Sequence, residues 1–205
     1  MTEVNAAVIY YSATGSTYAM AQAAAKAAEA AGADVRLRKV RELAPDEAIA
    51  SNEGWAEHAK RTQDVPEATL DDLEWADVLI FGTPTRYGLP TAQIKQFIDA
   101  TGPLWGAGKL VNKVATSFTS TGTAHGGQET TITALNNTFY HWGAIIVAPG
   151  YADPIQFEAG NPYGASHISN NGAIPPGDTE LGSVSFQATR AVEIGQALKA
   201  GLAAA

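Results

Sequence analysis

Five short apolar segments of the chain have the length and composition of β-strands. Two of them contain unbroken apolar runs, at 78–81 and 144–148. A strand that is apolar on both faces is typical of a parallel sheet covered by helices on both sides. The five predicted strands are Ala6–Tyr11, Asp34–Val40, Asp77–Thr83, Lys113–Ser120 and Gly143–Pro149.

Helical patterns lie between or after these strands. Alternation of strand and helix predicts crossover connections and a doubly wound α/β fold with a parallel sheet. We expect one domain that spans residues 1–205. The predicted helices are Thr17–Ala31, Pro45–Arg61, Thr91–Thr101, Gly127–Trp142 and Val184–Leu202.

One stretch, Tyr151–Gly182, breaks the alternation. It is rich in Gly, Pro, Asn and Ser and has little periodicity. A long irregular stretch inside a compact domain usually serves binding or an interface. We therefore expect an irregular insertion at about 151–182.

Composition narrows the possible functions. The 205 residues carry a net charge of −8, which argues against binding to nucleic acid or to anionic lipid. The sequence has no cysteine, so disulfides, thiolate catalysis and cysteine-ligated metals are excluded. The start of the chain lacks a signal-peptide pattern and no apolar run is long enough to span a membrane, so a cytoplasmic protein is expected.

The charged side chains offer no metal site. The four histidines have no metal-ligand spacing, and we expect no metal. The acidic run Glu67–Glu74 is expected to form a solvated helix face.

The strongest local signal follows the first strand and opens the first helix. A helix N-terminus offers free N–H groups and a favourable dipole to a phosphate, and hydroxyls add donors. One hydroxyl side chain would be enough to cap the helix. The four Ser and Thr residues within these six positions therefore favour a phosphate site. The pattern is neither a Walker A sequence nor G-x-G-x-x-G. Its residues are Ser12, Ala13, Thr14, Gly15, Ser16 and Thr17.

Two further loops follow the third and fourth strands. Gly82–Gly88 brings Thr85, Arg86 and Tyr87 to the same edge of the sheet, although a plain turn would explain this loop taken alone. The second loop is rich in small polar residues that can surround a planar heterocycle, although a flexible linker is the alternative. Its candidate residues are Thr119, Ser120, Thr121, Gly122, Thr123 and Ala124.

All three loops lie at the carboxyl ends of parallel strands, where open α/β sheets bind their ligands. In the flavodoxin-like fold, with strand order 2-1-3-4-5 and helices on both faces, FMN lies at the switch between the first and third strands, and we expect this arrangement here.

Several stretches carry a family resemblance. The chain resembles the tryptophan-repressor-binding-protein type of flavodoxin-like NAD(P)H:quinone oxidoreductase, known as WrbA. The matching stretches are Tyr10–Gly15, Phe81–Tyr87, Thr101–Trp105, Thr119–Glu129, Gly143–Tyr151 and Asn161–Ala165.

The resemblance implies roles for individual residues. Residues 12–17 would hold the FMN phosphate, 85–87 would line the isoalloxazine, and 119–124 would bind its pyrimidine edge and the ribityl chain. His141 would reach FMN, and Trp105 would form one wall of the quinone and nicotinamide site. Two positions depart from the family pattern: Thr14 stands where an aromatic residue is common, and His125 is an extra residue beside the glycines.

The implied activity is two-electron reduction of quinones by NADH or NADPH through FMN, in ping-pong order. The alternatives are a flavodoxin-type electron carrier and a flavin-binding regulatory protein. The resemblance and the irregular segment also predict a homotetramer whose active site is shared between subunits.

Overall fold

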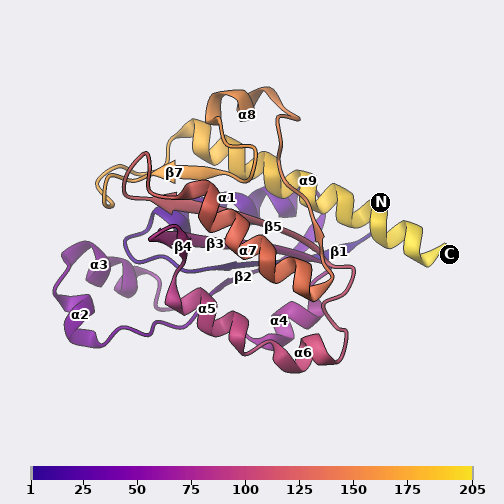
Figure 1. The fold of residues 1–205 in the computed structure, drawn as a ribbon, viewed down its shortest axis with the longest axis horizontal. Helices are drawn as coiled ribbons and strands as arrows, with labels where there is room; N and C mark the ends of the chain where they lie inside the picture. The colour runs from indigo at the N-terminus through magenta and orange to yellow at the C-terminus, as the bar shows by residue number, and fades with distance from the viewer. Residues whose placement is uncertain (1, 205) are drawn as a thin grey trace.

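The fold is a twisted parallel sheet between two layers of helices. The computed structural model describes residues 2–204 (Figure 1). The parallel strands stand in the order β2-β1-β3-β5-β6, which confirms the predicted order because β5 and β6 are the fourth and fifth predicted strands. Their bounds are β1 Val4–Tyr10, β2 Ala33–Lys39, β3 Val78–Arg86, β5 Val114–Thr121 and β6 Ile145–Ile146.

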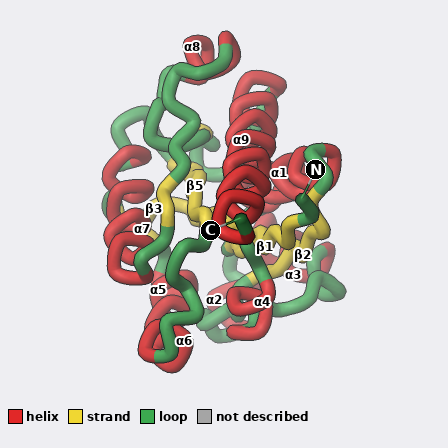
Figure 2. The backbone as a smooth tube through the Cα atoms, turned by 90° about the vertical axis from the view of Figure 1, so that its right-hand side faces the viewer, coloured by secondary structure: helices red, strands yellow, loops and turns green. Residues whose placement is uncertain are grey.

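Helices cover both faces of the sheet, as predicted. Figure 2 shows α1 and α9 on one side of the strands and α5, α6 and α7 on the other. Val8 and Ile9 are both fully buried but belong to different cores, because adjacent strand residues point to opposite faces. The bounds are α1 Ser16–Ala30, α4 Leu70–Trp75, α5 Ala92–Asp99, α6 Gly102–Gly106, α7 Gln128–Trp142 and α9 Asp178–Ala203.

The alanine-rich α1 packs closely on the sheet and on α9. Ala21, Ala24 and Ala28 are fully buried in the core of this face. Small side chains allow a helix to approach its neighbours closely, and they favour the helical conformation. The position of α1 in turn fixes where its N-terminus meets the ends of β1 and β5.

Two short segments share the fifth position of the sheet. β6 pairs only with the start of β5, at Val114 and Ala115, whereas β7 (Ser166–Ile168) pairs with its end, at Thr119–Thr121. The prediction of one strand over 143–149 is therefore too long. Pro149 has no N–H for a ladder and Gly150 has a positive φ of 56°, so the chain turns away after Val147.

The predicted irregular stretch contains regular elements. α8 (Pro154–Ala159) and β7 lie within it, and α9 begins at Asp178 rather than at residue 184. Gln187 of α9 connects this stretch to β5, because its side chain accepts from Ala165 N (2.7 Å) and donates to Thr116 Oγ1 (2.6 Å) and Ser117 O (2.8 Å).

Other boundaries also differ from the prediction. The helix predicted over 45–61 is divided into α2 (Asp46–Ala50) and α3 (Glu53–Arg61), because Asn52 Oδ1 accepts from Trp55 N and starts a new helix. β3 extends to Arg86 and forms a hairpin with β4 (Leu89–Pro90).

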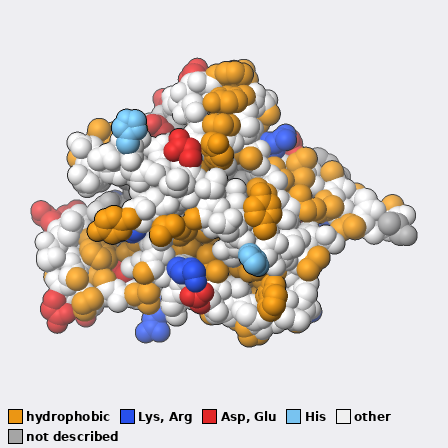
Figure 3. All heavy atoms as spheres, viewed as in Figure 1, with side chains coloured by type: hydrophobic (Ala, Val, Ile, Leu, Met, Phe, Trp, Pro, Cys, Tyr) orange, Lys and Arg blue, Asp and Glu red, His pale blue; other side chains and the backbone are white. Residues whose placement is uncertain are grey.

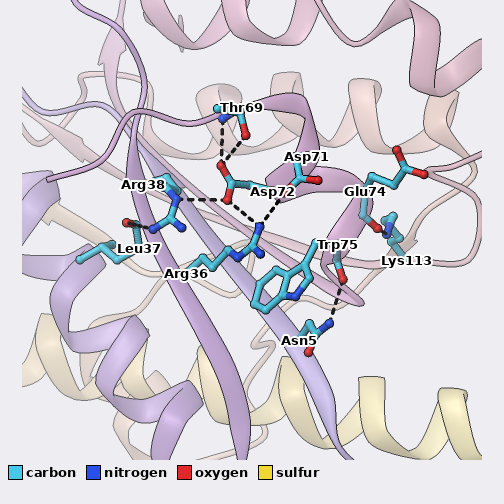
Figure 4. Close-up of polar contacts among 10 residues, drawn as sticks. All are labelled: Asn5, Arg36, Leu37, Arg38, Thr69, Asp71, Asp72, Glu74, Trp75 and Lys113. Atoms are coloured by element: carbon cyan, nitrogen blue, oxygen red, sulfur yellow. Dashed lines mark hydrogen bonds and ion pairs between the residues drawn. The ribbon is translucent and has the colours of Figure 1, made fainter.

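The prediction that the acidic run 67–74 forms a solvated helix face is wrong for Asp72, which belongs to the charged cluster in Figure 4. Asp71 and Glu74 are exposed, but Asp72 is buried and accepts from Arg36 Nη1 and Arg38 Nε, both at 3.1 Å. Burial raises the pKa of Asp72, yet the Thr69 donors and the two guanidiniums outweigh it and lower the pKa overall. The cluster fixes α4 against β2.

None of the helices within residues 2–204 combines the length and the apolar character needed to cross a membrane.

Candidate functional site

A cavity of about 260 Å³ opens at the carboxyl ends of β1, β3 and β5. Among the described residues that line it there is one cation, Arg86, and no carboxylate, although the protein as a whole is acidic. Hydroxyls and backbone supply most of the remaining lining, so the cavity is suited to an anionic ligand. The lining residues are Ser12, Ala13, Thr14, Ser16, Thr17, Pro84, Thr85, Arg86, Ser120, Thr121, Gly122, Ser169, Asn171 and Gly172.

The loop after β1 presents free backbone donors to this cavity. Gly15 is the N-cap of α1 with φ 109°, and its N–H donates to Ser12 Oγ (3.1 Å). The first helical hydrogen bond of α1 runs from Ala19 N to Gly15 O, and no side chain of the described chain caps the helix. The N–H groups of residues 16–18 are therefore available to a ligand. An anion there would also meet the positive end of the helix dipole.

One buried hydrogen bond links this loop to β5. Thr17 Oγ1 and Ser120 Oγ lie 2.8 Å apart, and both side chains are buried. The loop at residues 12–17, called the phosphate loop below after the ligand predicted for it from the sequence, thus meets the third predicted loop on one wall of the cavity.

Only some residues of the second predicted loop line the cavity. Thr85 and Arg86 line the cavity, and Thr85 Oγ1 also donates to Gly126 O (3.1 Å) and accepts from Thr131 (2.8 Å). Tyr87 and Gly88 both have positive φ and form the two-residue turn between β3 and β4. The side chain of Tyr87 is fully exposed and lies outside the cavity lining.

In the third predicted loop, Ser120, Thr121 and Gly122 line the cavity. Thr119 does not, because its side chain is buried and its hydroxyl donates to Thr83 O (2.7 Å). Thr123 and Ala124 lie beyond the cavity lining and are exposed.

A segment that sequence analysis did not assign to the site covers part of the cavity. Ser169 is fastened to β5 through its N–H and its hydroxyl, which both donate to Thr121 O at 2.8 and 2.9 Å. Asn171 and Gly172 then cross above the other two loops. A Cβ on Gly122 would lie 2.6 Å from Asn171 Oδ1, and one on Gly172 would lie 2.8 Å from Thr14 Oγ1.

Glu42 supports the edge of the site beside β1. Its carboxylate accepts from Tyr11 Oη (2.8 Å), Trp55 Nε1 (3.2 Å) and Gln93 Nε2 (2.7 Å). Burial raises the pKa of Glu42, but hydrogen bonds from backbone Ala44, from Gln93 and from Tyr11 more than compensate and lower it. The group is therefore an anchored anion that holds the loop after β2.

A comparison with known proteins places the chain in a family. A family model described as NADPH-dependent FMN reductase matches residues 5–156. The chain belongs to this family. It is 48% identical over 192 residues to the NAD(P)H dehydrogenase (quinone) of Deinococcus radiodurans, covering 93% of this chain and 95% of that protein. It is 43% identical over 193 residues to the enzyme of the same name from Sinorhizobium fredii, covering 91% and 94%.

A structural neighbour agrees with this assignment. The crystal structure of the flavodoxin, WrbA-like protein from Agrobacterium tumefaciens superposes with a TM-score of 0.65 and 26% identity, covering 95% of this chain and 98% of that one. The resemblance predicted from the sequence is thereby confirmed. Family membership makes FMN the ligand against which the cavity is to be tested.

The cavity fits FMN at its phosphate end. The backbone donors of residues 16–18 and the hydroxyls of Ser12, Thr14 and Thr17 would hold a monophosphate without a basic patch. The φ of 109° requires glycine at position 15, and a Cβ there would displace the flexible end of Arg61, whose Nη2 lies 2.9 Å from the Cβ position.

Trp105 and His141 lie away from this cavity. Trp105 Nε1 donates to His141 O (2.9 Å), which joins α6 to the last turn of α7. The N-terminus of α7 contacts the Thr85 loop, so its C-terminal end is about 20 Å away along a helix of 15 residues. Within the chain, the two residues are not brought together with the phosphate loop.

The site residues that sequence reasoning missed come from segment 169–172. The Asn-Asn-Gly signal at 170–172 does predict a tight turn, and all three residues have positive φ. Nothing in the local pattern shows that β7 would carry this turn to the end of β5.

Proposed function

We propose that the protein is an FMN-dependent NAD(P)H:quinone oxidoreductase. The observation that carries the proposal is the cavity at the ends of β1, β3 and β5. The N-terminus of α1, which no side chain within residues 2–204 caps, lies at this cavity, and none of the described residues that line it has a carboxylate. Family membership and the quinone-reducing names of the relatives support the same activity.

The residues of the chain bind and orient rather than transfer protons themselves. When bound, FMN supplies the two-electron chemistry between NAD(P)H and the quinone. The α1 N-terminus with Ser12 and Thr17 would hold the phosphate, while Thr85, Arg86 and residues 120–122 line the remainder of the cavity. Arg86, the one cation among the described lining residues, would place a positive charge beside the bound cofactor. NAD(P)H and the quinone would bind in turn, which is the ping-pong order that the family resemblance implies.

The deciding experiment is steady-state oxidation of NADH and NADPH by FMN-loaded protein with a quinone acceptor. Parallel double-reciprocal lines at several quinone concentrations are expected. Loading with FAD in place of FMN is the control, and it should support little activity because the loop suits a terminal monophosphate. Oxidation no faster than with free FMN would contradict the proposal and favour the electron-carrier alternative.

We also propose that the protein is cytoplasmic, because its co-substrate NAD(P)H is found there. We further propose that it is a homotetramer, because several apolar side chains are exposed. Tyr140, Phe157 and Trp105 are more than half exposed. Figure 3 shows hydrophobic side chains on this face over α6, α7 and α8. Exposed aromatic side chains of this kind are typical of subunit interfaces. In such an assembly, Trp105 and His141 of one copy would complete the flavin site of another.

Sedimentation velocity at several protein concentrations, with and without FMN, tests the assembly. FMN should favour the larger species if it binds across the interface. A monomer with full quinone reductase activity would contradict the shared site.

A further inference from the structure

A second, larger cavity adjoins the first on the other side of the phosphate loop. Its volume is about 600 Å³, within the range of small-molecule sites. The two cavities share three lining residues, Thr14, Ser16 and Gly172, so they are neighbours across that loop. We call the second one the outer cavity.

Among the described residues that line the outer cavity, only Arg61, the last residue of α3, has a charged side chain. Its Nη2 lies 2.9 Å from the position that a Cβ on Gly15 would take, so the guanidinium rests directly on the phosphate loop. Within residues 2–204, no carboxylate lies within ion-pair distance of Arg61, in contrast to Arg36 and Arg38, which both bind Asp72.

The partner that Arg61 does have is a neutral base. Its Nη2 lies 3.2 Å from His58 Nδ1, and His58 is only 4% exposed. Burial, with the charges of Arg61 and Lys39, lowers the pKa of His58 to about 4. A neutral imidazole accepts a hydrogen bond from the guanidinium without cancelling its charge. His58 therefore orients Arg61 and leaves the positive charge available to a ligand.

The remaining lining combines apolar surfaces with a few polar groups. Pro175, Pro176 and the ring of Tyr18 offer apolar surface, and Gln22 offers an amide. A cation beside flat apolar side chains suits a ligand that joins a phosphate to an aromatic base.

We propose that the outer cavity binds the adenosine-phosphate half of NAD(P)H, with the guanidinium of Arg61 on one of its phosphates. The inference rests on the proposed function, since NAD(P)H is the phosphate-bearing substrate of that reaction. The FMN phosphate does not account for Arg61, because the residue does not line the inner cavity, which has its own backbone donors. Arg61 is thus assigned to substrate affinity rather than to the chemical step.

The test is calorimetric titration of FMN-loaded protein with ADP-ribose and with 2′-phospho-ADP-ribose, neither of which can donate electrons. Wild-type protein should bind at least one of them. Arg61→Ala should weaken that binding about tenfold, as expected for a charge-assisted hydrogen bond. Arg61→Lys should retain part of it. The ligand that loses more affinity identifies the contacted phosphate.

Lys60→Ala is the matched control. Lys60 precedes Arg61 on α3, is exposed, makes no side-chain hydrogen bond or ion pair within the described chain, and lines neither cavity. The substitution removes the same charge from the same helix, so its ADP-ribose affinity should equal that of the wild type. In the steady state, Arg61→Ala should raise the KM for NAD(P)H, which is the signature of lost ground-state binding.

Three outcomes would overturn the inference: no binding of either probe to the wild type, equal affinity in Arg61→Ala, or a loss of FMN affinity in Arg61→Ala as large as the loss for ADP-ribose. Failure of the proposed function is separate from these. Protein that binds ADP-ribose through Arg61 but reduces no quinone would refute the activity and retain the site.

Discussion

Thr17 Oγ1 and Ser120 Oγ are 2.8 Å apart although 103 residues separate them in the sequence. The first lies in the first turn of α1, and the second lies near the end of β5. This hydrogen bond fixes the distance between the loop assigned to the FMN phosphate and the loop assigned to the rest of the cofactor. The order β1-β3-β5 in the sheet makes the contact possible.

We expect Thr17→Val to weaken FMN binding about tenfold, because it removes both this hydrogen bond and a donor to the phosphate. Fluorescence quenching during FMN titration measures the change. Thr133→Val is the control, since Thr133 is exposed on α7 and its hydroxyl bonds only to carbonyls of that helix. Equal affinities in both variants would show that the phosphate lies elsewhere.

Gly15→Ala should lower FMN affinity by at least tenfold. A Cβ at φ 109° is strained by about 1–2 kcal/mol and would press on Arg61. Gly201→Ala is the comparison, because that glycine lies in α9 with open space around its Cβ position. It should leave FMN affinity unchanged and, as a helix substitution, slightly raise the melting temperature. Normal FMN binding by the Gly15→Ala protein would refute the close approach of the loop.

Gln187→Leu should cost about 3 kcal/mol in the free energy of unfolding, measured by urea denaturation. The change leaves three polar groups of β5 and segment 161–165 without the partners that Gln187 supplies in the interior. Gln196→Leu removes one hydrogen bond, to Ala31 O, and should cost only about 1 kcal/mol. Equal losses in the two variants would mean that the buried Gln187 network does not fasten the insertion.

Protein stability should fall as the pH drops from about 6.5 towards 4, partly because of His58. The folded protein lowers the pKa of His58 to about 4, so in this window the unfolded chain binds a proton that the folded chain does not. The free energy of unfolding therefore rises with pH across it. His58→Gln should show a shallower slope over the same range. An unchanged slope would mean that other groups determine the acid sensitivity.

The sheet was predictable from the sequence because its central strands are buried on both faces. The unbroken apolar run at 78–81 forms part of the buried central strand β3, whereas the run at 144–148 yields only the two-residue edge strand β6. The polar loops that follow the strands identified most of the cavity. Ser12, Thr17 and Ser120 were found because a helix N-terminus and a strand end have recognisable local chemistry.

The errors come from tertiary contacts. Asp72 was assigned to a solvated face, since the sequence does not show that Arg36 and Arg38 of β2 face it. β7 has only three residues, which is too short for a periodic signal, and the buried Gln187 that accepts from Ala165 N just before it lies far away in the sequence. Arg61, proposed above to bind a phosphate of NAD(P)H, was not singled out because no local pattern in the sequence shows that it lies beside Gly15.

The division of the fifth sheet position between β6 and β7 has a consequence for motion. The start of β5 is held by β6, whereas its end is held by a segment that also covers the cavity through Ser169 and Gly172. Regions of a protein open in separate cooperative units. Backbone amides in 161–176 should therefore exchange with deuterium faster than those of β1 and β3, and bound FMN should slow them selectively. The rate of cofactor release would then be the opening rate of this segment.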